Sequence, residues 1–180
     1  MSSVPAVSCT GHQRSWMPRR CGEKGGTLTG PSPVDRGKPG SKLHVLSEAQ
    51  GIPLAVGVSA ANVHDSHALE PLVRAIPAIR SRRGPRRRRP GRLRADKACH
   101  SAETLAWLPG RGIAPRIARP GIEPAERLGR HRWKIERSLA WLFGYRRLTV
   151  RYERKGSHFL AFLGLAAALT CYKKLAKLAT

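Results

Sequence analysis

The order of apolar segments between Ser41 and the C-terminus constrains the fold more than any other feature of the sequence. Residues 42–47 and 53–59 alternate as strands do, and the turn signal Gln50-Gly51 between them predicts a hairpin. The later patterns predict, in order, a helix from residue 65 or 66 to about 79, a strand at 92–96, a helix capped by Ser101, a strand at 114–118, and helices at 126–143 and from 157 or 158 to 176. This order predicts a mixed α/β arrangement with helices packed on a sheet.

The first 40 residues differ from the rest of the chain. They are rich in Ser, Pro, Gly and Arg and show neither helical nor strand periodicity. We therefore expect residues 1–40 to be irregular and disordered, and residues 41–180 to form one domain, since 180 residues suit a single core.

The charge of the chain indicates a polyanionic partner. Lys and Arg total 34 against 11 Asp and Glu, a formal net charge of +23, which favours nucleic acid. No basic amphipathic helix with a clean apolar face lies at either end, so a membrane surface is not expected to be the partner. The apolar segment 159–171 is too short to span a bilayer and predicts a buried helix. No signal peptide is indicated, and we expect a cytoplasmic location.

Two basic clusters are candidates for contacts with phosphates. The first is a loop of six arginines: Arg82, Arg83, Arg86, Arg87, Arg88 and Arg89. The second is interleaved with Tyr145 and Tyr152, a mixture that suits a nucleic-acid strand, and holds Arg146, Arg147, Arg151, Arg154 and Lys155. Solvated arginines, around a partly buried tyrosine pair in the second cluster, are the structural alternative.

Asp96 and Glu136 are the candidate metal ligands. Asp96 ends a predicted strand, and ligands gather at the carboxyl ends of strands in open α/β sheets. Glu136 lies on the helix at 126–143, four residues after Arg132. If folding brings the two carboxylates together, they can hold Mg²⁺ for phosphodiester chemistry, with Arg132 touching a phosphate. A solvated Asp and an ordinary surface Arg–Glu pair are the simpler interpretations.

Other potential ligands carry weaker signals. His64 and His67 flank Asp65, but polar residues at a helix start explain them better than a metal site does. Cys99 and His100 are a conceivable nucleophilic pair, for which only a structure can supply evidence. Zinc-ligand spacing is absent among the cysteines, Cys9, Cys21, Cys99 and Cys171.

From Gly30 to the C-terminus the chain resembles the DDE transposases of bacterial insertion sequences. The matching segments are 29–42, 62–65, 95–98, 132–142 and 145–148. The resemblance implies DNA transposition by an RNase H-like mixed sheet flanked by helices, with Mg²⁺ or Mn²⁺ as cofactor and insertion-sequence ends as the DNA partner. A homodimer on DNA and association with the nucleoid are further options that it leaves open. By the same resemblance Asp96 matches the second catalytic Asp, Glu136 the catalytic Glu, and Arg132 the Arg one turn before it.

The first catalytic Asp of the family has no counterpart, and we expect the first strand to be missing or disordered. Trp16-Met17-Pro18, read two nucleotides out of register, must encode Asp followed by Ala, and one codon choice for residues 13–24 encodes an apolar strand ending in that Asp. We therefore expect an N-terminally truncated or frameshifted transposase, with weakly bound metal and little activity.

A non-catalytic DNA- or RNA-binding protein is the alternative function, because net charge supports it equally well. A pure binder has no need to bring Asp96 near Glu136. Carboxyl groups more than ~10 Å apart would favour the binder, since the ions of two-metal sites lie only ~4 Å apart.

Overall fold

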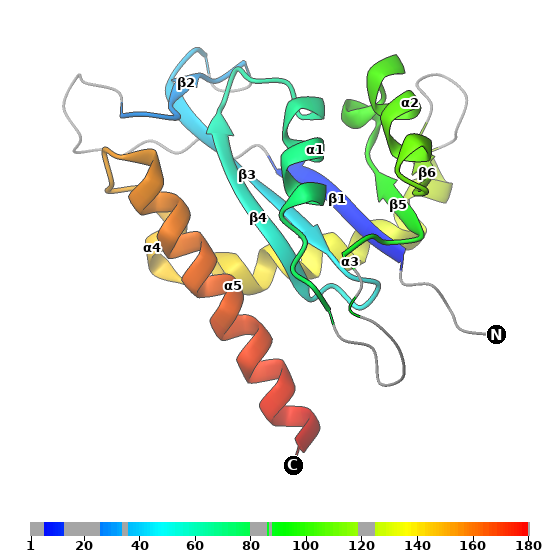
Figure 1. The fold of residues 1–180 in the computed structure, drawn as a ribbon. Helices are drawn as coiled ribbons and strands as arrows, with labels where there is room; N and C mark the ends of the chain where they lie inside the picture. Colours follow the sequence, from blue (N-terminus) through cyan, green and yellow to red (C-terminus); the bar gives the residue numbers. More distant parts are fainter. Residues whose placement is uncertain are drawn as a thin grey trace.

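The structure is a computed structural model that describes residues 6–12, 26–33, 36–79, 86, 88–118 and 125–179. For residues 6–12, 125–132 and 178–179 the description covers the backbone. Within these ranges the chain forms a six-stranded mixed sheet with helices on both faces (Figure 1). The predicted α/β architecture is therefore confirmed.

The sheet is built around the predicted hairpin. Its strands are β1 (Ala6–His12), β2 (Gly30–Pro31), β3 (Pro39–Ser47), β4 (Pro53–Ala60), β5 (Arg92–Ala95) and β6 (Ala114–Ile117). β3 pairs antiparallel with β4, β1 and the short β2, whereas β1, β5 and β6 are parallel to one another in that order. The carboxyl ends of β1 and β5 therefore lie at the end of the sheet away from the turn between β3 and β4.

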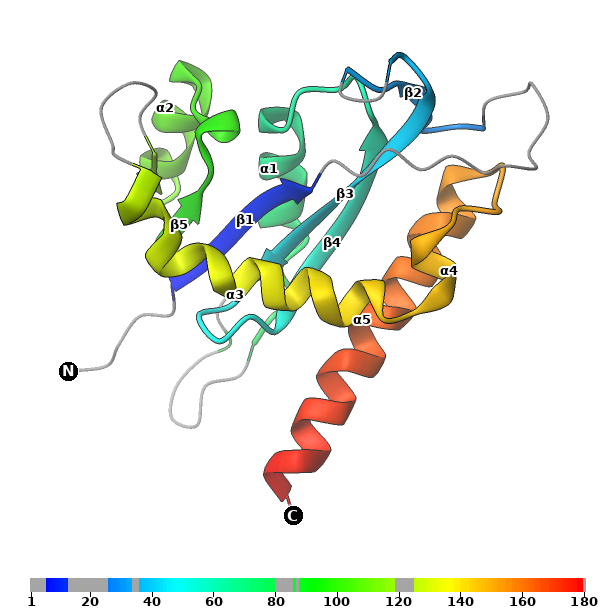
Figure 2. The same ribbon diagram turned by 180° about the vertical axis from the view of Figure 1, so that it is seen from behind.

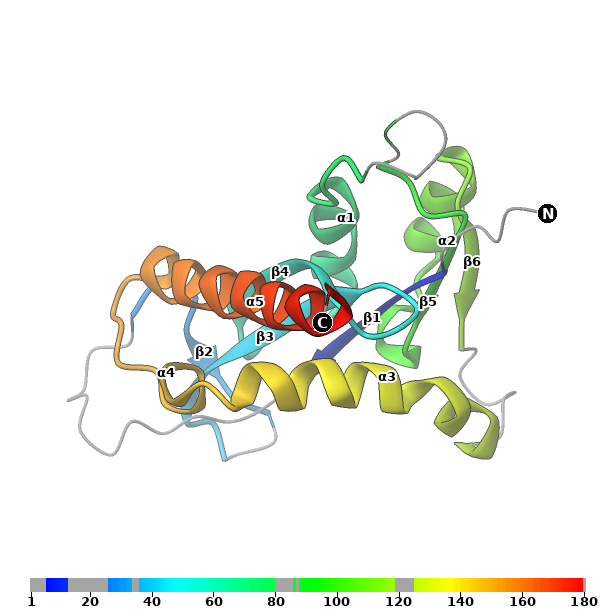
Figure 3. The ribbon, with the colours of Figure 1, turned by 90° about the horizontal axis from the view of Figure 1, so that it is seen from below.

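The helices form a layer on each face of the sheet (Figure 3). They are α1 (Ser66–Arg74), the 3-10 turn η1 (Lys97–Cys99), α2 (Ala102–Gly110), α3 (Ala125–Phe143), the short α4 (Arg146–Thr149) and α5 (Gly156–Ala179). One apolar core joins α1 and α2 to β5 and β6. A second core joins α3, α4 and α5 to β3.

The prediction that the first strand is missing or disordered was wrong for residues 6–12, whereas residues 1–5, 13–25 and 34–35 of the same segment lie outside the described residues. Residues 6–12 form β1 in the middle of the sheet, between β3 and β5, so the first strand is neither missing nor disordered. The reason is tertiary: β3 and β5 each present an edge of backbone N–H and C=O groups, and a strand between them satisfies both edges. A short sequence without clear periodicity can fill such a position, because the bonds come from its backbone.

The C-terminal helix is longer and more exposed than the sequence indicated. α5 spans 24 residues, and its segment Gly156–Lys177 is long and apolar enough to cross a bilayer. One such helix is weak evidence for a membrane span, because core helices of water-soluble proteins meet the same criteria. Here Phe159 and Leu163 are buried against the sheet, whereas Leu165 and Tyr172 are 61% and 68% exposed.

Two predicted helix starts have different outcomes. Ser101 caps α2 as expected, because its Oγ accepts a hydrogen bond from the Thr104 N–H at 3.1 Å. Asp65 precedes α1 but makes no side-chain cap, since its carboxylate accepts from Lys42 Nζ at 3.0 Å. The Lys42 ammonium is buried in the sheet, and this ion pair gives it a partner there.

Candidate active site

Asp96 directly follows β5, and its carboxylate lies on the α3 side of the sheet. Leu93 and Ala95 belong to the core beneath α1 and α2. Successive residues of an extended chain point to opposite faces, and Asp96 itself is extended, with φ −72° and ψ 166°. Arg94 and Asp96 therefore point to the opposite face. The Asp96 carboxylate is half-buried and accepts a hydrogen bond from the Lys97 N–H at 2.7 Å, which caps η1.

Glu136 lies on α3, which crosses β1 and β3 on that same face (Figure 2). Ile135 and Leu139 pack into the core against β3. Ser138 Oγ donates to the carbonyl of Gly51, so the flank of α3 that carries Ser138 faces the turn between β3 and β4. At 3.6 residues per turn Glu136 lies about 160° around the helix from Ser138. Glu136 is exposed on the opposite flank, which is turned toward the end of the sheet that holds Asp96.

A third carboxylate is missing from the position beside Asp96. β1 and β5 are paired up to Cys9 and Ala95, and continuing this register by one residue places the Thr10 backbone beside Asp96. β1 contains neither Asp nor Glu. Over the described part of the chain no group of three His, Cys, Asp or Glu side chains could hold a metal ion. Two carboxylates can hold one Mg²⁺ with water and phosphate ligands, but they do not match the ligand set of a two-metal centre.

Several predicted contact residues lie wholly or partly outside the described residues. The backbone of Arg132 is in α3, but its side chain is outside the description, as are Arg82, Arg83 and Arg87. The other three arginines of that loop are exposed to solvent: Arg86, Arg88 and Arg89. Their contact with DNA stays a prediction.

Arg151 is a structural residue, and the prediction that it binds DNA was wrong. Its side chain is buried, and its guanidinium donates to Thr27 O at 2.6 Å, to Thr29 Oγ1 at 3.0 Å and to Ser41 Oγ. Burial lowers the pKa of Arg151, while the nearby Glu153 carboxylate acts to raise it. These bonds tie the segment before β2 to the start of β3, which leaves no guanidinium N–H for a phosphate.

Arg146 and Arg147 of the second cluster are exposed. Arg146 lies at the start of α4, and Arg147 pairs with Glu153 at 3.0 Å while its guanidinium lies over the Phe162 ring. The weaker candidate sites gain no support. His64 Nδ1 is bonded to Ser66 Oγ at 2.8 Å, and Cys99 is 1% exposed within the apolar core. The burial of Cys99 does not suit a nucleophile.

The sequence analysis overlooked two arginines beside Asp96. Arg94 in β5 and Arg116 in β6 are direct neighbours in the parallel register, and both lie on the α3 side of the sheet. The available signal was the alternation of arginine with apolar residues in two predicted strands. Only the pairing of those strands brings the two side chains together.

Comparisons with known proteins place this geometry in context. The family described as "Transposase DDE domain" matches residues 15–171. The chain is similar to the "Putative transposase for insertion sequence element IS402" of Burkholderia cepacia, with 44% identity over 147 residues. That alignment covers 82% of this chain and 70% of the relative. The central strand β1 precedes the residues that the family matches.

Proposed function

We propose that the chain binds insertion-sequence ends and takes part in DNA transposition, because it belongs to the transposase DDE domain family of insertion sequences. A formal charge of +23 supports a DNA partner. A mixed sheet with helices on both faces supports an RNase H-like domain. We infer a cytoplasmic protein that associates with the nucleoid, and a homodimer on DNA is compatible with this function.

In this proposal Asp96 and Glu136 hold a divalent cation, Mg²⁺ or Mn²⁺, and Arg132 contacts a phosphate. The observation that carries it is that Asp96 and Glu136 lie on one face of the sheet, with Glu136 on the flank of α3 turned toward the end that holds Asp96. The cation, when bound, supplies an activated water and stabilises the leaving oxygen. Asp96 is pre-positioned for binding because its carboxylate is held by the Lys97 N–H.

We further propose that this chain by itself cleaves DNA poorly. β1 places no carboxylate beside Asp96, so the site lacks both charge and a ligand, and we expect weak binding of Mg²⁺. We infer an out-of-frame origin for residues 1–24, of which the family match covers residues 15–24. In that account the reading frame is restored near Lys24.

Non-catalytic nucleic-acid binding is the second candidate function. One observation favours it: the described residues provide no three-ligand metal site, whereas the positive charge that suits a polyanion is retained. The two functions differ in whether any metal-dependent cleavage persists.

The test is Mg²⁺-dependent nicking of DNA that carries the insertion-sequence ends. The chain is assayed beside a version with the frame of residues 1–24 restored and beside that version with Asp96→Asn. We expect nicking by the restored version alone, since only it has three carboxylates. Equal nicking by the native chain would mean that another residue replaces the missing Asp. Absence of nicking in all three would favour the non-catalytic function.

A single substitution in the native chain makes a similar test without a change of reading frame. Thr10→Asp places a carboxylate at the register position beside Asp96, and we expect it to raise the affinity for Mn²⁺ in a calorimetric titration. Thr10→Asp combined with Asp96→Asn is the control and should lose that gain. If the two variants bind Mn²⁺ alike, position 10 is not part of the site.

A further inference from the structure

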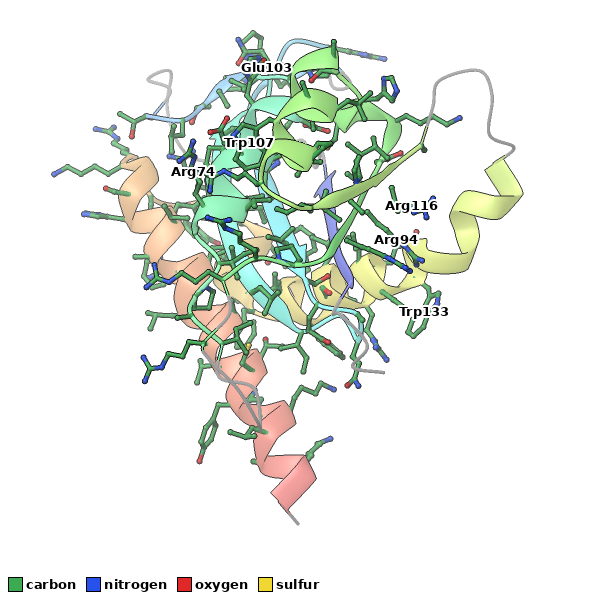
Figure 4. All side chains as sticks on the ribbon, turned by 45° about the vertical axis from the view of Figure 1, so that its right-hand side comes forward. Arg74, Arg94, Glu103, Trp107, Arg116 and Trp133 are labelled. Carbon is green, nitrogen blue, oxygen red and sulfur yellow. The ribbon has the colours of Figure 1, made fainter. Side chains whose placement is uncertain are left out.

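Two arginines lie side by side on the α3 face of the sheet, close to Asp96. Arg94 of β5 is paired in register with Arg116 of β6. The alternate residues Leu93, Ala95 and Ile117 belong to the core beneath α1 and α2, so both arginines point to the opposite face. Figure 4 shows the two side chains next to each other, above the N-terminal half of α3.

On this part of the sheet face the two arginines reach solvent. The core beneath α3 and α5 takes Leu43 and Val45 from β3, and within the described side chains it takes none from β5 or β6. Arg116 is accordingly exposed and Arg94 is half-buried. The described α3 contacts lie on β1 and β3, and solvent reaches both guanidinium groups at the β5–β6 side.

The arrangement is unfavourable unless an anion completes it. Neighbouring strands lie about 4.8 Å apart, and like charges directly opposite each other destabilise a sheet. Over the described ranges neither guanidinium forms an ion pair, and the nearest carboxylate in β5, that of Asp96, accepts from Lys97. A phosphodiester between the two side chains would relieve the repulsion, because a guanidinium binds phosphate oxygens bidentately.

We propose that Arg94 and Arg116 bind the phosphate backbone of a DNA strand and guide it toward Asp96. Arg94 precedes Asp96 by two residues on the same face, a rise of about 7 Å along the strand. A strand held there by its phosphates runs along this face to the Asp96 carboxylate. This inference rests on the proposed DNA-binding function, and it assigns that function to two residues outside both arginine clusters.

Salt dependence of DNA binding tests the assignment. The probe is a fluorescein-labelled DNA duplex, and its dissociation constant is measured by anisotropy between about 50 and 200 mM NaCl, where each phosphate contact contributes a slope of about 0.9 in log K against log salt. The double variant Arg94→Gln with Arg116→Gln is expected to lose about 1.8 from that slope and to bind about tenfold more weakly at the higher salt concentration.

The matched control removes the same two charges elsewhere. Arg74 and Arg111 both lie over the Trp107 ring on the α1–α2 side of the sheet. Figure 4 shows Arg74 beside Trp107. The double variant to glutamine should keep the native slope and affinity within about twofold. Circular dichroism and thermal melting of both double variants establish that each is folded. If the Arg94–Arg116 double variant fails to fold, the same salt dependence is measured on the single variants Arg94→Gln and Arg116→Gln.

Each outcome is informative. If the native chain fails to bind the duplex, the proposed function itself fails. If the native chain binds and the Arg94–Arg116 variant binds equally well, or if both double variants lose the same affinity, the inference is wrong while DNA binding stands. In those cases Arg116 serves only as a charge that protects the edge strand β6 from pairing with other chains, and Arg94 is not a DNA contact.

Discussion

At the scale of single residues, burial decides what an arginine does. Arg147 and Arg151 belong to one basic cluster in the sequence, yet the Arg147 side chain is 58% exposed whereas Arg151 is 8% exposed. Arg151 also lies over the Phe159 ring, and its Nε donates to Glu153 O at 2.9 Å. The planar guanidinium of Arg151 donates to several acceptors at once, and a lysine ammonium cannot reproduce this geometry.

We predict that Arg151→Lys destabilises the protein by about 2–3 kcal/mol, because buried hydrogen bonds from a charged group are lost. Urea unfolding at constant salt measures the change in the free energy of unfolding. Arg147→Lys is the control: position 147 is exposed and a lysine can keep the ion pair with Glu153, so the free energy should change by less than about 1 kcal/mol. Equal effects of the two substitutions would contradict a structural role for Arg151.

Burial of His44 also makes the stability of the fold depend on pH. His44 is 2% exposed, and its Nε2 lies 2.7 Å from Ser59 Oγ. Burial lowers the pKa of His44; Asp65 acts to raise it, and Lys42 acts to lower it further. The unfolded chain therefore protonates His44 more readily than the folded chain does. The contribution of neutral His44 to the free energy of unfolding is present above pH 6.5 and is lost as pH falls below that value.

We therefore predict that the free energy of unfolding falls between about pH 7.5 and 5.5, with at most about 1.4 kcal/mol per pH unit from His44. His44→Gln should flatten this part of the stability profile, whereas substitution of the exposed His158 by Gln should leave it unchanged. Urea unfolding at the two pH values makes the measurement. An unchanged slope in His44→Gln would assign the pH dependence to other groups.

At the scale of elements, the seating of α3 on the β3–β4 turn determines the direction of Glu136. Arg137 and Ser138 donate to the carbonyls of Gln50 and Gly51, respectively. Gly51 has φ +87°, and a Cβ built there would lie 2.8 Å from Lys134 O. Glycine therefore permits both the turn and the close approach of the helix.

We predict that Gly51→Ala costs about 2–4 kcal/mol, since it combines a strained φ with a contact against the α3 backbone. Gly112→Ala is the matched control, because Gly112 has φ +70° with no atom within 4 Å of a Cβ built there. The control isolates the cost of φ alone, about 1 kcal/mol. Thermal or urea unfolding of both variants measures the difference. A difference near zero would mean that α3 moves freely relative to the turn.

At the scale of the whole molecule, two apolar cores on one sheet hold together a chain with a charge of +23. Such a charge destabilises the compact state through repulsion between like charges. We predict that the thermal midpoint rises as NaCl increases from about 20 to about 300 mM, because the screening length shortens. Thermal melts followed by circular dichroism give the midpoint. A flat or falling midpoint would mean that local ion pairs outweigh the net repulsion.

Much of the architecture could be predicted because it depends on local patterns. The hairpin, the strands at β5 and β6 and the helices α2 and α3 were located by apolar periodicity and turn residues. The helix α1 was also located, and Leu69 and Leu72 are among its core residues. The end of α1 at Arg74 and the length of α5 were less well predicted, since tertiary packing determines where a helix stops.

The sequence by itself determined the net charge, the order of elements from Ser41 onward, and the places of Asp96 at a strand end and Glu136 on a helix. Only the tertiary structure decided that residues 6–12 fill the centre of the sheet, that Arg151 is buried, and that Arg94 lies beside Arg116. The physical reason is that periodicity acts over neighbouring residues. Strand register and burial depend on partners that are distant in the sequence.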